Sequence, residues 1–350
     1  MKIRPILTAA LLFTLTAAAP INAPLPNAAI VRNDPALDRL IDPKAEMRKL
    51  GEGYGWSEGP VWIEDGQYLL FSDVPGNRIH KWSAADGVTV YMDPSGGNGP
   101  AQPGFREPGT NGLKPGIAGE ILAADHGSRA VAAIDLATRA KRLLVTRFNG
   151  KKFNSPNDVA VAPDGAIWFT DPPYGLEGVN ESPLKEQPVN GVYRAASDGV
   201  ATLVEGSLTF PNGITFSPDA KTLYVAVSDP KRAIIMAYDV TAQQALARPR
   251  IFSDMTALVG KENPGLPDGM TVDEQGNVYA TGPGGVHVFA PSGKRLGVIR
   301  TGTGVANVTF GGPDGRTLFL TSHNMLVALT TKVRGGPIRR PLALARGERG

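Results

Sequence analysis

The sequence contains no cysteine in 350 residues. This absence excludes disulfide bonds, a thiolate nucleophile, a sulfur-ligated metal and an anchor attached to a lipidated cysteine. Histidine is also scarce: the four histidines lie at positions 80, 126, 287 and 323, and none has the i, i+4 spacing of a zinc-binding helix. No P-loop or dinucleotide-binding glycine motif is present, so the sequence gives no support for nucleotide chemistry.

Long amphipathic helices are missing from the pattern of the sequence. No stretch repeats apolar residues at a sustained 3.6-residue period, and 42 glycines with 30 prolines would interrupt helices repeatedly. The apolar run at residues 6–19 is short, contains threonine and follows the basic residues Lys2 and Arg4. Residues 1–23 therefore predict an export signal rather than a membrane-spanning helix. We expect a periplasmic or secreted protein without stable membrane association after signal cleavage.

The formal net charge of +3 is unevenly distributed along the chain. Residues 1–23 contribute +2 and the tail at residues 332–350 contributes +5, which leaves about −4 for the body of the protein. A mildly acidic body without a basic stripe predicts no nucleic-acid partner. The tail is rich in glycine, proline and arginine, and this composition predicts disorder.

Six segments of the chain share one pattern of two short strands around a turn, and the second strand ends in Thr, Ser or Asp. They span residues 58–73, 111–127, 157–171, 212–229, 268–282 and 307–322, and further strand-like runs lie between them. The repeat predicts an all-β, six-bladed β-propeller over residues 45–331, with four antiparallel strands per blade and an N-terminal extension at 24–44. Seven blades or a pair of sandwiches are the alternatives.

Two turn-rich inserts, residues 93–116 and 175–190, interrupt the repeats. In a propeller, such loops rim one face and shape access to the channel, or they are plain surface loops. The sequence supports both interpretations equally.

Four of the repeats begin with a residue that carries an oxygen ligand: Glu58, Asn157, Asn212 and Asp268. If equivalent positions of a circular repeat converge on its axis, these side chains lie close together. Carboxylate and amide oxygens are hard ligands suited to Ca²⁺, and two acids with two neutral amides match its double positive charge. The pattern predicts a divalent-metal site, whereas the alternative is that each residue merely begins a turn.

The motif Pro-Asp-Gly occurs three times, in two different settings. At residues 163–165 and 313–315 it lies between two strands, as a hairpin turn does. At residues 267–269 it precedes its strand, in register with Pro156-Asn157 and Pro211-Asn212. Asp268 therefore belongs with the two asparagines and not with the turns.

Two other residues, Ser57 and His126, lie in sequence contexts that suggest a catalytic or binding role. Ser57 lies in a G-x-S-x-G match at residues 55–59, but Pro60 and an alternating strand follow instead of the helix that a nucleophile elbow requires, so Ser57 is interpreted as structural. His126 ends the second repeat and is a candidate proton carrier or substrate contact, with a hydrogen-bonded structural histidine as the alternative.

The sequence resembles the gluconolactonase and regucalcin (senescence marker protein) family of six-bladed propeller hydrolases. The motifs that carry the resemblance cover about residues 45–325 in order: SEGPVW at 57–62, FSD at 71–73, NGL at 111–113, DHG at 125–127, SPNDV at 155–159, WFTDPPYG at 168–175, FPNG at 210–213 and PDGM at 267–270. The resemblance implies one divalent cation, commonly Ca²⁺, held by Glu58, Asn157, Asn212 and Asp268. It also implies that Asn111 and His126 contact the substrate.

We expect a metal-dependent lactonase that hydrolyses sugar (aldono-) lactones or related cyclic esters, with a small-molecule lactone as its partner. The cation polarises the lactone carbonyl, and Asp268 is the candidate general base, or in a variant mechanism the nucleophile. Mg²⁺, Mn²⁺ or Zn²⁺ are alternatives to Ca²⁺ in an oxygen site. The alternative functions are a phosphotriesterase-like hydrolase on the same scaffold and a calcium-stabilised binding propeller without turnover.

Overall fold

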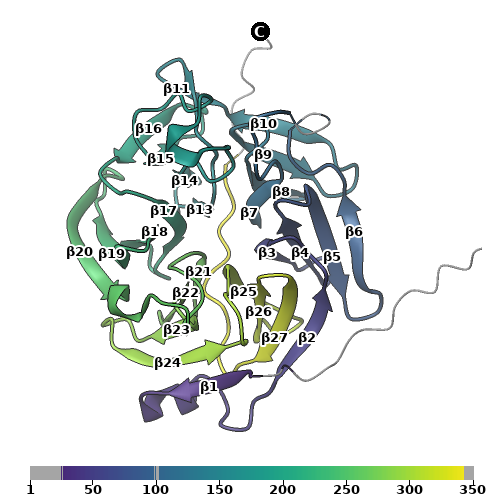
Figure 1. The fold of residues 1–350 in the computed structure, drawn as a ribbon, viewed down its shortest axis with the longest axis vertical. Coiled ribbons are helices and arrows are strands. Elements are labelled where there is room, and N and C mark those ends of the chain that lie inside the picture. The colour runs from purple at the N-terminus through teal and green to yellow at the C-terminus, as the bar shows by residue number, and fades with distance from the viewer. Residues whose placement is uncertain (1–24, 26, 98, 100–101, 343–350) are drawn as a thin grey trace, which may run out of the picture.

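The computed structural model describes residues 25, 27–97, 99 and 102–342. Six antiparallel sheets stand around a common axis, which confirms the predicted six-bladed β-propeller (Figure 1). The export signal predicted for residues 1–23 lies outside the described residues and stays a prediction. Within the described ranges, no helix is long and apolar enough to cross a membrane.

The first four blades each consist of four consecutive strands. Blade one contains β3 (Ser57–Ile63), β4 (Tyr68–Asp73), β5 (Arg78–Ser83) and β6 (Gly87–Met92), and blade two contains β7 (Thr110–Pro115), β8 (Glu120–Asp125), β9 (Ala130–Asp135) and β10 (Lys141–Val145). Blade three contains β13 (Val159–Val161), β14 (Ile167–Asp171), β15 (Gly191–Ala195) and β16 (Ala201–Glu205), and blade four contains β17 (Pro211–Phe216), β18 (Thr222–Asp229), β19 (Arg232–Val240) and β20 (Leu246–Asp254).

The last two blades each recruit a strand from the N-terminal part of the chain. Blade five contains β21 (Met270–Val272), β22 (Val278–Gly282), β23 (Gly285–Phe289) and β24 (Arg295–Arg300), and β1 (Ala29–Arg32) pairs with β24 as its fifth strand. Blade six contains β25 (Asn307–Gly311), β26 (Thr317–Ser322) and β27 (Met325–Thr330), and β2 (Met47–Glu52) is its outer strand. The pairing of β2 with β27 closes the ring and joins the two ends of the propeller.

The remaining elements among the described residues are short. A two-stranded hairpin of β11 (Arg147–Phe148) and β12 (Lys151–Lys152) follows blade two. Three 3₁₀ helices lie in connecting segments: η1 (Pro35–Arg39), η2 (Val179–Glu181) and η3 (Thr256–Leu258). Because η1 packs its buried Leu37 against the clusters of blades five and six, the N-terminal extension is part of the folded body.

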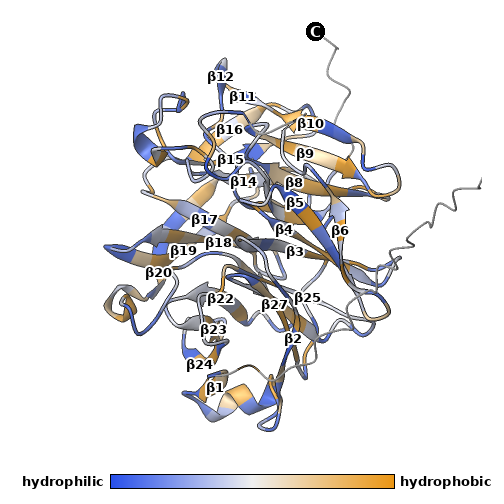
Figure 2. Ribbon diagram, turned by 45° about the vertical axis from the view of Figure 1, so that its right-hand side comes forward, coloured by the Kyte–Doolittle hydropathy of each residue, from blue (hydrophilic) through white to orange (hydrophobic). Residues whose placement is uncertain are grey.

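The hydrophobic core is a ring of layers between neighbouring blades rather than one central mass. Apolar side chains alternate along the strands, and each face of a blade packs on the facing side of the next blade. Between blades six and one, for example, the Trp62 ring stacks on Phe319 at 5.6 Å between centroids. Figure 2 shows the apolar colour concentrated on the strands and the polar colour on many of the turns. The axis itself is therefore free for polar groups.

Hydroxyl groups at the ends of the second strands join one blade to the next. Ser72 donates to the Asn111 carbonyl oxygen (2.8 Å), Thr170 donates to that of Asn212 (2.6 Å), and Ser228 donates to the Pro267 carbonyl oxygen. Each acceptor lies on or beside the inner strand of the following blade. The recurrent Thr or Ser at this position of the repeat thus holds neighbouring inner strands in register.

The C-terminal segment at residues 332–342 crosses one end of the central channel, where the inner strands end (Figure 1). It bonds to blades two to six, through Arg340 Nη1 to Gly116 O (3.1 Å), Leu342 N to Gly165 O (3.3 Å), Arg339 Nη2 to Pro218 O (2.6 Å), Gly336 N to Val272 O (2.8 Å) and Gly335 N to Gly315 O (3.2 Å). The ring thus gathers carbonyl acceptors that this segment reaches, whereas the disorder expected for the tail stays a prediction. The rest of the tail, residues 343–350, lies outside the described residues.

Candidate functional site

The first residues of the inner strands converge at the opposite end of the channel. Glu58 lies in β3, Asn111 in β7 and Asn212 in β17, whereas Asn157 and Asp268 lie two residues before the first residues of β13 and β21. All five line one cavity of about 790 Å³. The structure therefore brings together the four predicted metal ligands, called the axial oxygen set below (Glu58, Asn157, Asn212 and Asp268), and adds Asn111 to the same wall.

Glycine follows several of these residues because the inner strands approach each other closely. At Gly59, where φ is +45°, an added Cβ would lie 1.9 Å from the Asn111 carbonyl oxygen of the next blade. At Gly213, a Cβ would lie 2.1 Å from the Asp268 carbonyl oxygen. The Glu-Gly and Asn-Gly pairs of the sequence therefore combine an oxygen ligand with the small residue that lets the strands converge.

Hydrogen bonds between the amides fix the direction in which their oxygens point. Asn111 Nδ2 donates to Asn157 Oδ1 (2.9 Å), and Asn157 Nδ2 donates to Asn212 Oδ1 (2.5 Å). Asn212 Nδ2 continues the chain to Ser228 Oγ (3.0 Å). Each acceptor oxygen carries a second lone pair, so the bonded amides can still ligate a cation.

Asn307, at the start of β25, is the sixth member of the same series. It is buried and donates through Nδ2 to Glu58 Oε2 at 3.1 Å, and the Gly59 amide donates to the same oxygen at 2.8 Å. Asn307 begins the sixth repeat of the sequence, which is the signal that could have identified it. The prediction of four ligands does not include this residue. The structure shows that Asn307 orients Glu58.

Neither acid of the axial oxygen set forms an ion pair with another described residue; Glu58 is buried and Asp268 is partly buried. Asp268 Oδ1 is buried and has no hydrogen-bond partner among the described residues. Burial raises the pKa of Asp268 well above its ordinary value, and the negative charge of Glu58 raises it further. Burial also raises the pKa of Glu58, where Asp158 and Glu107 act in the same direction. Two facing acids of raised pKa with an unpaired oxygen form a site that a cation would stabilise.

The donor set determines the kind of ion that fits here. Within the described ranges, no three His, Cys, Asp or Glu side chains gather closely enough to hold a metal. A cation at this place therefore needs the amides of Asn157 and Asn212 beside the two carboxylates. An all-oxygen set of acids and amides suits a hard cation such as Ca²⁺ better than a metal that prefers nitrogen or sulfur.

His126 lies behind the cavity wall rather than on it. The residue is fully buried, and its Nδ1 lies 3.1 Å from the Glu107 carbonyl oxygen. Because a carbonyl only accepts, Nδ1 carries the hydrogen and Nε2 is left unprotonated, without a partner among the described residues. Burial lowers the pKa of His126, which favours this neutral form. The structure supports the structural alternative for His126, and the expected direct contact with a substrate stays a prediction.

Ser57 is structural, as the sequence interpretation states. Its side chain is buried and its Oγ lies 2.9 Å from both the His323 and Met325 carbonyl oxygens, across the closure between blades one and six. The residues after it form β3 and not a helix. The G-x-S-x-G match is therefore not a nucleophile elbow.

The insert at residues 93–116 reaches the site. Its residues Arg106 and Glu107 line the cavity, and both backbone amides donate to the Gly175 carbonyl oxygen at 3.0 and 3.3 Å. The first insert therefore rims the active face and rests on the start of the second insert. Trp56, Tyr174, Ser228 and Lys261 also line the cavity, and sequence reasoning did not single them out. Of these, Trp56, Tyr174 and Lys261 lie outside the strands, where the repeat gives no signal.

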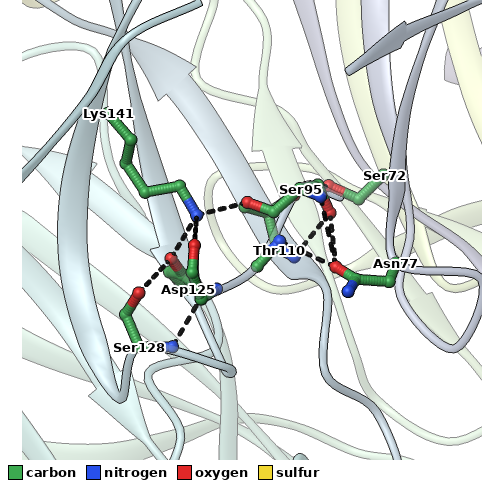
Figure 3. Close-up of polar contacts among 9 residues, drawn as sticks. Ser72, Asn77, Ser95, Thr110, Asp125, Ser128 and Lys141 are labelled. Atoms are coloured by element: carbon green, nitrogen blue, oxygen red, sulfur yellow. Dashed lines mark hydrogen bonds and ion pairs between the residues drawn. The ribbon is translucent and has the colours of Figure 1, made fainter. Parts of the chain in front are cut away.

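A buried ion pair anchors the base of the first insert (Figure 3). Lys141 Nζ, from β10, lies 2.6 Å from Asp125 Oδ2 and donates to the carbonyl oxygens of Ser95 and Gly97. Asp125 also accepts from Ser128 N (3.0 Å) and Ser128 Oγ (2.6 Å). We call this group the Lys141 network.

Three comparisons with known proteins agree with this geometry. The family model described as "SMP-30/Gluconolactonase/LRE-like region" matches residues 56–324. The chain is 41% identical to a gluconolactonase of Zymomonas mobilis over 310 residues, which cover 87% of each protein. A gluconolactonase structure from Xanthomonas campestris superposes with a TM-score of 0.75 at 32% identity, covering 90% of this chain and 98% of that one.

A more distant structure shares the fold. Regucalcin of Agrobacterium tumefaciens, described as a calcium-binding protein, superposes with a TM-score of 0.66 at 21% identity, over 85% of this chain and 97% of that one. At this level of identity the likeness shows the propeller alone. It supports the same architecture. The candidate metal ligands are inferred from the geometry of this chain alone.

Proposed function

Because the chain belongs to the SMP-30/gluconolactonase/LRE-like family, as its sequence motifs predict, we propose that it is a divalent-cation-dependent lactonase that hydrolyses sugar (aldono-) lactones. The observation that carries the proposal is the convergence of two acids and two amides on one cavity, with Asp268 Oδ1 unpaired among the described residues. The relatives with gluconolactonase names support the choice of substrate class.

The axial oxygen set would hold the cation. Glu58 and Asp268 supply negative charge, whereas Asn157 and Asn212 supply neutral oxygens that leave the ion more of its positive charge. When bound, a divalent cation polarises the lactone carbonyl and stabilises the negative charge that develops on its oxygen. We favour Ca²⁺, which the name of the regucalcin structure also mentions for that protein. Mg²⁺, Mn²⁺ and Zn²⁺ are the ions to compare.

Asp268 accepts a proton in the reaction we propose. The oxygen of a water molecule attacks the carbonyl carbon, and Asp268 takes the proton from that water. The bond from the carbonyl carbon to the ring oxygen then breaks, and Asp268 returns the proton to this oxygen to give a hydroxy acid. The unpaired Oδ1 gives Asp268 a free acceptor inside the cavity. In the variant mechanism this carboxylate attacks directly, and labelled oxygen from water would enter the protein in a single turnover.

The site can receive substrate from one side. The cavity opens at the end of the channel where the inner strands begin, and the segment at residues 332–342 crosses the other end. A small cyclic ester would therefore meet the axial oxygen set directly on entry. We further propose that the protein is exported, as its first 23 residues predict.

The test is hydrolysis of glucono-δ-lactone by purified protein before chelation, after chelation and after addition of each ion. We expect activity to disappear with the chelator and return with Ca²⁺, and elemental analysis to find about one divalent ion per chain. An organophosphate assayed in parallel would reveal the phosphotriesterase alternative. Failure to hydrolyse any lactone of a broad panel with saturating Ca²⁺ would favour the binding propeller instead.

A further inference from the structure

Tyr174 lies three positions after the end of β14 and directly before the second insert, residues 175–190. Its ring stacks on Phe210, with centroids 5.7 Å apart and planes inclined by 15°. Ser155 fixes the backbone on both sides, because its Oγ donates to the Pro172 carbonyl oxygen (2.7 Å) and accepts from the Gly175 amide (2.9 Å). The side chain is therefore held in one orientation.

The hydroxyl of Tyr174 is buried and has no hydrogen-bond partner among the described residues. Tyr174 lines the cavity together with Asn212, Ser228 and Asp268. Two of these neighbours already accept hydrogen bonds, since Asn212 Oδ1 accepts from Asn157 Nδ2 and Ser228 Oγ accepts from Asn212 Nδ2. A buried donor left without an acceptor in this way needs an explanation.

The hydroxyl of Tyr174 keeps its hydrogen near neutral pH, because the ordinary pKa of a tyrosine side chain is about 10. The group is therefore a neutral hydrogen-bond donor. Tyr174, with its unpaired donor, and Asp268, with its unpaired acceptor, line the same cavity.

We propose that Tyr174 is a further catalytic residue, whose hydroxyl donates a hydrogen bond to an oxygen atom of the reacting ester group. This inference rests on the proposed lactonase function. As water attacks, negative charge develops on the ester oxygens, and a donor already fixed in a buried site stabilises that charge without reorganisation. Tyr174 keeps its own proton throughout, so the step adds no group to the balance of the hydrolysis.

The test compares Tyr174→Phe with Tyr193→Phe. The first change removes the hydroxyl and keeps the ring on Phe210. Tyr193 is a matched control because its hydroxyl is also buried without a partner among the described residues, while its ring packs on Phe169 in the core between blades two and three, away from the cavity. Each variant is assayed with glucono-δ-lactone, and Ca²⁺ affinity and binding of the non-hydrolysable gluconolactam are measured by calorimetry.

We expect Tyr174→Phe to lower kcat by about 10²-fold, with a smaller change in KM, because the bond strengthens as charge develops. Lactam binding should weaken, whereas Ca²⁺ affinity should stay as in the wild type. Tyr193→Phe should match the wild type in all of these measurements.

Three results would overturn the inference. Wild-type kcat and lactam affinity in Tyr174→Phe would show that the hydroxyl does not contact the ester, and would leave the lactonase proposal intact. Loss of Ca²⁺ affinity, with kcat restored at saturating Ca²⁺, would show that Tyr174 supports the ligands instead. A wild-type protein that hydrolyses no lactone would overturn the proposed function and this inference together.

Discussion

Two groups of acidic side chains in this protein are compensated differently. In the Lys141 network, Asp125 is fully buried and is neutralised by Lys141, and both its oxygens accept hydrogen bonds. In the axial oxygen set, Glu58 is buried and Asp268 is partly buried, but none of the ion pairs among the described residues involves them. The first group holds a loop in place, and the second keeps an oxygen unpaired.

This difference separates structure from function. A buried charge costs several kcal/mol unless a partner compensates it. In the Lys141 network the compensating partner, Lys141, belongs to the same chain, so the carboxylate of Asp125 is always paired. The axial oxygen set has no such partner among the described residues, and in the proposed function a cation from solvent would supply it. The candidate site is marked by an acid that lacks a partner and also lines the cavity.

The largest effect should follow from removing the unpaired acid. We expect Asp268→Asn to lower kcat for lactone hydrolysis by about 10²- to 10⁴-fold, because the variant has no proton acceptor at this position. The chelated variant should be at least as stable as the chelated wild type, since an uncompensated buried charge is gone. Steady-state kinetics and thermal unfolding in the presence of a chelator measure both effects.

The sequence offers a matched control for this variant. Asp164 occurs in another Pro-Asp-Gly motif, where it accepts from the Ala166 amide (3.1 Å) and pairs with Arg194 (2.6 Å) in a hairpin turn. Asp164→Asn should keep full activity. Equal activity in the two variants would show that Asp268 takes no part in the reaction. It would also contradict the difference in function between the axial oxygen set and the Lys141 network.

The next effect concerns the satisfied acid. We expect Lys141→Met to lower the free energy of unfolding by about 3–5 kcal/mol, because it leaves the buried Asp125 without its counter-charge. Cation affinity should stay unchanged, since the axial oxygen set comes from inner strands rather than from the insert. Denaturant unfolding and calorimetry measure the two quantities. Adding Asp125→Asn should restore part of the loss, whereas a fully additive loss in the double variant would argue against the pair.

The same contrast explains what the sequence can predict. The axial oxygen set follows a repeat, and equivalent positions of a ring meet on its axis, so Glu58, Asn157, Asn212 and Asp268 could be grouped in advance. Asn307 begins a repeat as well, but the repeat alone does not predict that its amide donates to Glu58. The partners of Asp125 could not be grouped in this way, because Lys141 and Ser95 come from an outer strand and an irregular insert, whose positions no repeat specifies.

Ring closure and the C-terminal segment were also beyond the sequence. The pairing of β2 with β27 and of β1 with β24 brings together residues more than 250 positions apart in the chain. Residues 332–342 carry the composition of a disordered tail, yet they form hydrogen bonds to backbone groups of five blades that lie side by side only after folding. Local composition cannot predict these tertiary contacts, and the disorder of the tail stays a prediction.

The effect of pH should be of intermediate size and should depend on the cation. Burial raises the pKa of Glu58 to about 7, so between the unfolded value near 4.5 and this value the native state holds more protons. The free energy of unfolding of the chelated protein should therefore be highest at low pH and fall as pH rises towards 7. Because Ca²⁺ displaces those protons, its stabilising effect should grow with pH, by about 1.4 kcal/mol per pH unit for each proton displaced.

Thermal unfolding from pH 5 to 8, with chelator and with Ca²⁺, measures this difference. Glu58→Gln should reduce its dependence on pH. Asp171→Asn provides the control, because burial raises the pKa of Asp171 as well but this residue does not line the cavity. Its variant should keep the full calcium-dependent difference. A stabilisation by Ca²⁺ that is independent of pH in the wild type would contradict the assignment of raised pKa values to the ligands.

The smallest effect should follow from removing the hydroxyl of Thr170, which contacts the backbone of the predicted ligand Asn212. Thr170 Oγ1 donates to the Asn212 carbonyl oxygen at 2.6 Å and accepts from the Asp158 amide at 3.1 Å, which places a hydroxyl between blades three and four directly below a ligand. We expect Thr170→Val to lower the free energy of unfolding by about 1 kcal/mol and to weaken Ca²⁺ binding, because Asn212 loses its anchor. The exposed Thr202→Val should change neither quantity. Lower stability with unchanged Ca²⁺ affinity would mean that the axial oxygen set is positioned by the strands alone, and that the hydroxyls between blades serve the fold without serving the site.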